Sequence, residues 1–388
     1  MVIHAAKEVR VVYRVLSSLA EAQPDQVDIL HAGKNGTFSL LVHEELAEEV
    51  AAAVKPYASS QGSITISKIE EVNIEHGWKD SGRKKRSLND FDLESYNTYS
   101  SIKEYIYALA EDYQDICATE VIGETFEGRE IIAVKVHGLD SSKPRVKIFI
   151  DGTQHAREWI SPAVLVFLIT KLVTGYASDE LWAVNMLEKY EFHIVPIVNA
   201  DGYAYSHNTT NGRFWRKNRK INKETSCIGV DLNRNWGFHW SGRGGSSYEC
   251  SQIYYGESEF SEPETNALAV YIKKYKGSWH SYFSFHSYGQ MILFPWSHSS
   301  IQSPDHYYHL MAGEKMAEGI KNVFNGTVYR VGSVGSLLYA ASGSSESWAY
   351  ARGDFPYSFT IELPNLYNFV LPKSRIAPTT LEIINGLQ

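Results

Sequence analysis

Two residues with metal-binding side chains stand three positions apart in the segment 151–159, His155 and Glu158. In the first turn of a helix both would face one point, and an imidazole nitrogen with a carboxylate oxygen is a donor pair that suits zinc. The pattern is weak alone, because the chain has 14 histidines and such a pair is more often a surface ion pair. A catalytic metal site therefore needs a third ligand.

His286 is the candidate third ligand, because it stands directly after a run, 281–285, that reads as a strand. Taken alone, a histidine in this place is more often a core residue with a hydrogen-bond partner. With His155 and Glu158 it would make three protein ligands, which leaves a fourth position open for water, as a catalytic zinc ion requires.

The segments around these residues alternate between strand-like and helix-like patterns. Such alternation predicts an α/β fold with a mixed central β-sheet flanked by helices. Both candidate ligand segments follow predicted strands, where active sites of open α/β sheets lie. Ser261 and Glu264 are spaced as a capping box before the helix 265–275. The expected strands are 146–150, 191–198, 281–285, 291–294 and 357–361, and the expected helices are 161–174, 265–275, 306–324 and 378–387.

A smaller unit precedes a polar break at residues 80–86. Helical spacing at 9–22 and 44–54, with strand-like runs at 26–30, 37–42 and 63–69, predicts a small α/β sandwich. The basic run that ends at Arg86 has three interpretations: a solvated linker, a nuclear localisation tract or a processing site for a protease specific for basic residues. Its position between two foldable units supports the last. The expected domains are 1–86 and 87–388.

Composition argues against several classes of function. The formal net charge of −8 argues against a nucleic-acid partner, because phosphate binding needs an excess of Lys and Arg. No apolar run approaches the ~20 residues that span a bilayer, so no membrane partner is expected. Residues 1–16 carry charges where a signal peptide has its apolar region; either the protein is not secreted, or this chain lacks its leader. The Gly-x-Ser-x-Gly and His-Glu-x-x-His motifs of other hydrolases are absent from the sequence.

Five separated motifs, in order, resemble the metallocarboxypeptidases of the pancreatic A/B type over nearly the whole second unit. They are HAREW (155–159), FWRKNR (214–219), GVDLNRNW (229–236), FHSY (285–288) and YSFTIEL (357–363). The resemblance implies one zinc ion per chain, held by His155, Glu158 and His286, and hydrolysis of the C-terminal bond of peptides and proteins. Residues 1–86 resemble the family's inhibitory prosegment more loosely, which implies a secreted, monomeric proenzyme that a protease activates at or after Arg86.

The same motifs imply roles for residues around the metal. Glu362 is expected to be the catalytic carboxylate, Arg216 to polarise the scissile carbonyl and Asp231 to orient His155. The expected clamp on the terminal carboxylate of the substrate and the expected outer subsites comprise Asn233, Arg234 and Tyr339, and Arg157 and Tyr288. A disulfide between Cys227 and Cys250 is also implied, which indicates an oxidising compartment.

In this family a side chain at the pocket floor decides which C-terminal residue is removed. By its place relative to the family motifs, Glu346 is expected at the floor of this pocket and Ser297 on its wall. A buried carboxylate without a partner is unfavourable, so a C-terminal Lys or Arg is its natural ligand. The B-type pattern has Asp here, and the longer Glu could swing out or shrink the pocket. The alternatives are a broad apolar or aromatic preference, or an inactive family member that serves as a binding module.

Overall fold

The computed structural model describes residues 88–388 except 141, 143, 209–211, 324, 325 and 366–368. Before residue 88 it describes residues 2–4, 12, 15, 16, 19, 27–32, 37–42, 46–57, 64 and 65. The predicted boundary and processing site at Arg86 lie outside the described residues.

An eight-stranded mixed sheet forms the centre of the larger unit, in the order β11-β10-β12-β9-β7-β8-β6-β5. The four strands β12, β9, β7 and β8 are parallel, whereas β10, β6 and the edge strand β5 bring antiparallel pairs. This confirms the predicted fold class. The strands are β5 (Cys117–Glu124), β6 (Glu130–Val136), β7 (Val146–Gly152), β8 (Tyr190–Val195), β9 (Trp279–Ser287), β10 (Met291–Phe294), β11 (Arg330–Ser333) and β12 (Tyr357–Leu363).

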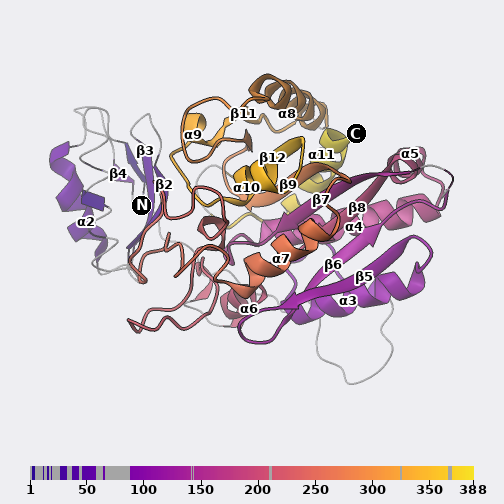
Figure 1. Cartoon of the computed structure of the whole chain (residues 1–388). Coiled ribbons are helices and arrows are strands. Elements are labelled where there is room, and N and C mark those ends of the chain that lie inside the picture. Colours follow the sequence, from indigo (N-terminus) through magenta and orange to yellow (C-terminus); the bar gives the residue numbers. More distant parts are fainter. Residues whose placement is uncertain are drawn as a thin grey trace.

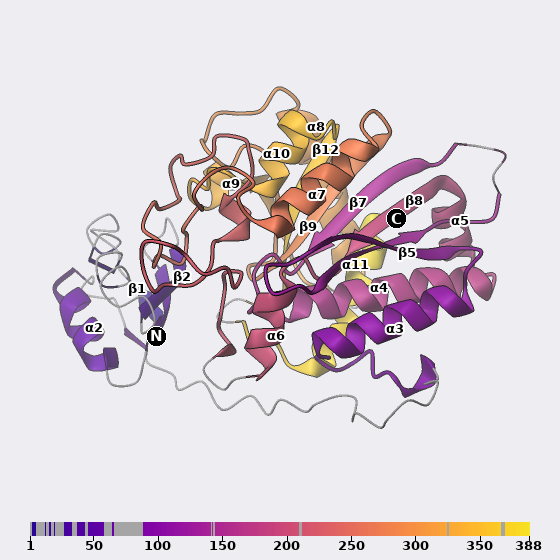
Figure 2. The ribbon, with the colours of Figure 1, turned by 60° about the horizontal axis from the view of Figure 1, so that its bottom comes forward.

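Helices cover both faces of this sheet, as Figures 1 and 2 show. Alternate strand residues divide between two cores: Ile148 and Ile150 of β7 pack on the side of α3, α4 and α11, and Phe149 packs on the side of α7 and α10. The helices are α3 (Tyr99–Asp112), α4 (Ile160–Ala177), α5 (Leu181–Lys189), α6 (Ala200–Asn208), α7 (Pro263–Lys274), α8 (His306–Lys321), α9 (Val334–Leu337), α10 (Ser345–Arg352) and α11 (Ile376–Leu387).

Helix α4 is apolar on nearly every side and is long enough to cross a membrane, by length and composition alone. In the fold, 78% of it is buried, and it packs between the sheet and its neighbouring helices. A helix that is apolar all round fits such a core position. Helix α4 therefore serves as the central core helix, with its first turn directly behind Glu158.

The small N-terminal unit has a four-stranded antiparallel sheet in the order β2-β3-β1-β4, with α2 (Ala47–Val54). Its core joins apolar residues of β2, β3 and α2 to the described helical residues Val12 and Leu16. This matches the predicted small α/β sandwich. Its strands are β1 (Val2–His4), β2 (Val27–Ala32), β3 (Thr37–Val42) and β4 (Ile64–Thr65).

The predicted capping box before α7 is wrong. The N-cap residue is Glu262, with Pro263 at the first helical position. The hydroxyl of Ser261 donates to the Glu262 carboxylate at 2.7 Å and accepts from Asn235 at 3.0 Å. Its hydrogen-bonding capacity is therefore used by side chains, and the helix begins with the preferred proline.

Candidate active site

A cavity of about 80 Å³ opens beside the carboxyl ends of β7, β9 and β12. Apart from Asp231 and Ser297, every residue predicted for the catalytic cleft lines it. These residues are His155, Arg157, Glu158, Arg216, Asn233, Arg234, His286, Tyr288, Tyr339, Glu346 and Glu362.

Strand pairing explains how distant parts of the chain meet here. In the parallel pair β9–β12, His286 lies opposite Glu362. In the parallel pair β7–β9, Asp151 lies opposite Ser284. The turn after β7 then carries His155 and Glu158 into the same cavity, just before α4 begins. Strands β9 and β12 and the turn after β7 thus supply both histidines and both glutamates.

The side chains of His155, Glu158 and His286 converge. His155 Nδ1 lies 2.8 Å from Glu158 Oε1, His286 Nδ1 lies 3.0 Å from Glu158 Oε2, and the two Nδ1 atoms are 3.2 Å apart. Donors bound to one zinc ion at about 2.0–2.1 Å and at tetrahedral angles are about 3.3 Å apart. The spacing and the chemistry of this buried donor set therefore fit a zinc ion.

Each histidine has a hydrogen-bond acceptor at Nε2, so its neutral form carries the proton there and leaves Nδ1 to bind a metal. His155 Nε2 donates to Asp231 Oδ1 at 3.0 Å, which leaves its Nδ1 without a proton. Ser284 donates its hydroxyl hydrogen to Asp151 Oδ1 at 2.8 Å, so its oxygen accepts from His286 Nε2 at 3.0 Å. Asp151 and Ser284 were not predicted from the sequence; the available signal is that they lie on two strands that lead directly into the ligand motifs.

Electrostatic interactions in the cluster favour the metal-binding protonation states of two side chains, neutral His155 and ionised Glu158. Burial lowers the pKa of His155, and the Arg216 charge lowers it further. For Glu158 burial opposes ionisation, but His155 and His286 outweigh it and lower the pKa of the carboxyl. For His286 burial favours the neutral ring, but the Glu158 carboxylate outweighs it and raises the pKa to about 9.

Glu362 lies partly exposed in the cavity, across the strand pair from His286. Within the described part of the chain, neither of its carboxylate oxygens accepts a hydrogen bond. Burial raises the pKa of Glu362 to about 8; Glu158 adds to the rise, whereas His286 and Arg216 oppose it. A divalent cation at the adjacent cluster would lower this pKa. The arrangement gives a carboxylate poised to exchange a proton with a molecule in the cavity.

Arg216 and Asp231 form a buried ion pair behind the cluster. Arg216 Nε and Nη2 both donate to Asp231 Oδ2, at 3.1 and 2.8 Å. For Asp231 burial opposes ionisation, but Arg216, Arg234 and His155 hold its pKa well below the usual range. Nη1 of Arg216 has no hydrogen-bond partner among the residues that the structure describes, and this side chain lines the cavity. Arg216 can therefore offer a fixed cationic donor to a ligand.

Arg234 and Asn233 are positioned by the backbone around them. Arg234 donates from Nε to Gly244 O at 2.7 Å and from Nη1 to Asn233 O at 2.8 Å. Its Nη2 has no partner in the part of the chain that is described. The Asn233 side-chain oxygen accepts from the Ser345 backbone at 2.9 Å. Tyr339 is 45% exposed at the cavity wall. These groups offer donors suited to a carboxylate.

Glu346 is buried at the start of α10 and lines the cavity. Its Oε1 accepts hydrogen bonds from Ser344 at 2.8 Å and Ser347 at 2.9 Å. Ser297 lies behind them, 2.5 Å from the Ser344 hydroxyl oxygen and 2.9 Å from that of Ser347. Ser344 and Ser347 were not predicted; only the fold of α10 brings them onto this carboxylate.

Arg157, Tyr288 and Phe369 make one wall of the cavity. The Arg157 guanidinium stacks 4.4 Å from the Phe369 ring centre, and the Tyr288 ring meets Phe369 edge-on at 4.9 Å. Phe369 also lines the cavity and was not predicted from the sequence. It lies between the end of β12 and α11, in a stretch without a recognised motif.

The predicted disulfide is present between Cys227 and Cys250, whose Cα atoms are 5.0 Å apart. Cys117 is a free, buried thiol. The bridge closes a segment of the chain that contains Asp231, Asn233 and Arg234. Three site residues therefore stand inside one covalently closed loop.

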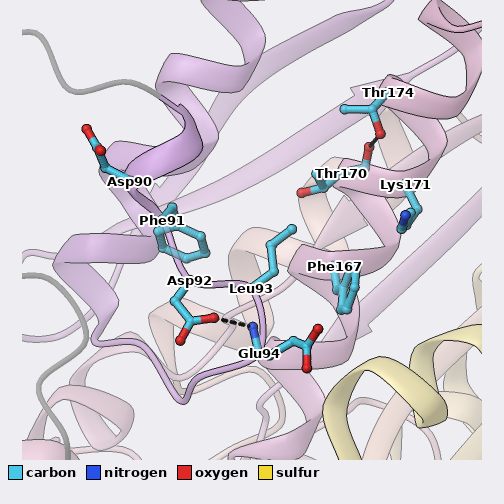
Figure 3. A pocket seen from close by; sticks show the side chains of 9 residues that line it. All are labelled: Asp90, Phe91, Asp92, Leu93, Glu94, Phe167, Thr170, Lys171 and Thr174. Atoms are coloured by element: carbon cyan, nitrogen blue, oxygen red, sulfur yellow. Dashed lines mark hydrogen bonds between the residues drawn. The ribbon is translucent and has the colours of Figure 1, made fainter. Parts of the chain in front are cut away.

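A larger cavity of about 550 Å³ lies elsewhere, between residues 90–94 and one side of α4 (Figure 3). Its walls contain no histidine. Its Asp92 carboxylate accepts from the Glu94 backbone at 2.9 Å and from the Ser95 hydroxyl at 2.5 Å. Among its described lining residues this cavity has no converging set of metal-binding side chains, unlike the smaller one.

Comparisons with known proteins agree with the geometry. The sequence profile of the family described as zinc carboxypeptidase matches residues 102–386. The chain is 36% identical to carboxypeptidase B of Astacus astacus, over 76% of this chain and 96% of the relative. It is 32% identical to zinc carboxypeptidase A 1 of Anopheles gambiae, over 97% and 87%. The crystal structure of thrombin activatable fibrinolysis inhibitor superimposes with a TM-score of 0.87 at 30% identity, covering 100% of this chain and 96% of that one.

These matches extend over both the catalytic core and, in two cases, nearly the whole chain. They confirm the resemblance that the five motifs indicated. The chain belongs to the zinc carboxypeptidase family and is a peptide hydrolase.

Proposed function

We propose that this carboxypeptidase binds one zinc ion through His155, Glu158 and His286 and removes Lys or Arg from the C-terminus of peptides. The observation that carries the proposal is that one cavity holds this donor set together with Glu362, Arg234 and the buried carboxylate of Glu346. Similarity to a protein named carboxypeptidase B adds support.

Arg234 would hold the terminal carboxylate of the substrate. Its Nη2 is open toward a ligand while its other two nitrogens are fixed by backbone carbonyls, and a guanidinium binds a carboxylate strongly. Asn233 and Tyr339 would complete this clamp. An internal peptide bond has no such carboxylate, so only the last residue is removed.

Glu362 would take the proton from the attacking water and pass it to the leaving amine. A zinc ion supplies Lewis acidity, which acidifies water and polarises a carbonyl. Arg216, which Asp231 holds by two hydrogen bonds, would direct its remaining nitrogen at the oxyanion that develops on the scissile carbonyl. Asp231 and the Ser284–Asp151 pair would keep both imidazoles in their ligand tautomer.

Glu346 would bind the cationic side chain of the C-terminal residue. A buried carboxylate is unfavourable without a positive partner, and this one lines the substrate cavity. Arg157 and Tyr288 would contact residues of the substrate that precede the cleaved bond.

Residues 1–86 would act as a prosegment, and an activating protease would cleave at or after Arg86. The small α/β unit and the match of nearly the whole chain to one relative support this. The Cys227–Cys250 disulfide supports a secreted protein. We propose that the enzyme is a monomer.

The proposal is tested with protein that has first been treated with an activating protease. Its hydrolysis of matched peptides that end in Lys, Arg, Phe, Leu or Glu is measured with and without a chelator. Fast release of Lys and Arg that the chelator abolishes and zinc restores is the expected result. Glu346→Ile should shift the preference to apolar ends. Preferred release of Phe or Leu by the wild type would refute the basic preference, and zinc binding without hydrolysis of any peptide would favour the inactive binding module.

A further inference from the structure

Four buried side chains form a closed polar cluster at the start of α10: Glu346, Ser344, Ser347 and Ser297. Each is at most 1% exposed. The two serines that flank Ser345 and Glu346 both donate to the same carboxylate oxygen, Oε1. Within this cluster the two carboxylate oxygens of Glu346 therefore differ in how many hydrogen bonds they accept.

A carboxylate oxygen has two lone pairs. The hydroxyls of Ser344 and Ser347 occupy both lone pairs of Oε1, at 2.8 and 2.9 Å. Within the described residues, Oε2 accepts no hydrogen bond. Glu346 therefore presents a single acceptor oxygen to a ligand, and not the paired edge of a free carboxylate.

The hydrogen atoms of the cluster can be assigned in turn. Ser344 and Ser347 give theirs to Glu346, so the Ser297 hydroxyl donates to one of these two serines. Ser347 Oγ also accepts from the Ser297 backbone at 3.0 Å. The cluster then has no hydrogen atom left for a ligand, and Oε2 of Glu346 is the carboxylate oxygen that remains without a donor among the described residues.

We infer, on the basis of the proposed function, that this pocket selects Lys over Arg as the C-terminal residue. An ammonium is a compact point charge with three rotatable donors, so it can bind a single carboxylate oxygen. A guanidinium binds a carboxylate best as a planar fork that needs both oxygens. Reaching Oε1 would displace a serine hydroxyl and leave it without an acceptor, which is unfavourable in a buried site.

The test compares kcat/KM for peptides that differ only in a C-terminal Lys, Arg or Leu. For the wild type, Lys should exceed Arg by about tenfold, the factor that one net hydrogen bond supplies. Ser344→Ala and Ser347→Ala each free a lone pair of Oε1, so the Lys-to-Arg ratio should fall toward one in each and further in the double variant. Ser342→Ala removes a buried hydroxyl other than the two that donate to Glu346 and should leave the ratio unchanged.

The possible outcomes distinguish the preference for Lys over Arg from the proposed preference for basic C-terminal residues. Equal rates for Lys and Arg, or faster release of Arg, overturn the inference and leave the basic preference standing. A Lys preference that both serine variants retain overturns the lone-pair explanation. Faster release of Leu overturns the basic preference itself. Two measurements use the wild type alone and so do not depend on the folding of a variant. They are the Lys-to-Arg ratio of kcat/KM and a comparison of the inhibition constants of free lysine and free arginine.

Discussion

Ser284 and His286 stand two residues apart on β9, and a 3.0 Å hydrogen bond joins the hydroxyl oxygen of the first to Nε2 of the second. The Ser284 hydroxyl passes its own hydrogen to the fully buried carboxylate of Asp151 on β7. His155 contacts Asp231 directly. Each histidine is thus oriented by a carboxylate, one of them through a serine.

Ser284→Ala should weaken zinc binding by about 10–100-fold, the usual effect of losing a partner behind a metal-binding histidine. Without the serine, His286 loses the acceptor that fixes its tautomer. Competition with a chelator measures the affinity. Ser281→Ala, on the same strand, removes a hydroxyl that contacts His280 and should leave the zinc affinity unchanged. Equal affinities in the wild type and both variants would show that Ser284 does not orient His286 for metal binding.

Glu362→Gln should reduce kcat by about 10²–10⁴-fold, because the amide cannot accept the proton that the proposed reaction transfers. Zinc content should stay at one ion per chain, since Glu362 is outside the donor set. Steady-state kinetics with a metal assay checks both. Activity close to that of the wild type would remove Glu362 from the proposed proton transfer.

Asp231→Asn should destabilise the metal-free protein by about 3–5 kcal/mol, the effect of breaking a buried ion pair by removing one partner. It should also weaken zinc binding, because His155 loses its carboxylate. Asp201→Asn is the matched control: it breaks the ion pair of a buried aspartate with Arg129, away from the metal. Urea unfolding should show a loss in both variants, and chelator competition a loss only in Asp231→Asn.

Glu264 should make the fold less stable as pH rises. Burial raises the pKa of this carboxyl to about 8, and the Glu262 carboxylate adds to the rise; its Oε1 has no partner among the described residues. Between about pH 4.5 and 8 the folded state keeps a proton that the unfolded chain has lost, so the free energy of unfolding falls by up to about 1.4 kcal/mol per pH unit. Above pH 8 this contribution stops changing.

Glu264→Gln, which keeps an acceptor for Asn218, should remove this slope. The measurement is the free energy of unfolding in urea at several pH values for both metal-free proteins. The free energy of unfolding of the wild type should fall relative to that of the variant as pH rises from 5 to 8, a window set by the raised pKa. A difference that stays constant over this window would show that Glu264 is ionised in the folded protein.

Strongly apolar strands could be read from the sequence. The predicted ranges 291–294 and 37–42 coincide with β10 and β3, because each is a short β-rich run. The sequence does not predict β5, an edge strand whose residues are mostly exposed or partly exposed and lack clear alternation. Helix α10 is also missed: its first residues are serines and a glutamate, which favour turns unless tertiary contacts bury them.

The site shows the same division. His155 and Glu158 are close in sequence, so their meeting follows from local structure. The Asp151–Ser284 contact instead depends on the register of β7 against β9, which no local pattern specifies. The two serines on Glu346 likewise depend on how α10 docks. Contacts that require strand register or helix docking could not be predicted from the single sequence.

Because Cys227 and Cys250 close a loop, the residues proposed for catalysis are held in place by two different parts of the structure. His286 and Glu362 lie on strands of the sheet and His155 and Glu158 in the turn after β7. Asp231, Asn233 and Arg234 lie within the bridged segment. Reduction of the disulfide would therefore loosen both the residues proposed to bind the substrate carboxylate and the Asp231 carboxylate behind His155, whereas a chelator would remove the metal and leave the bridged segment intact.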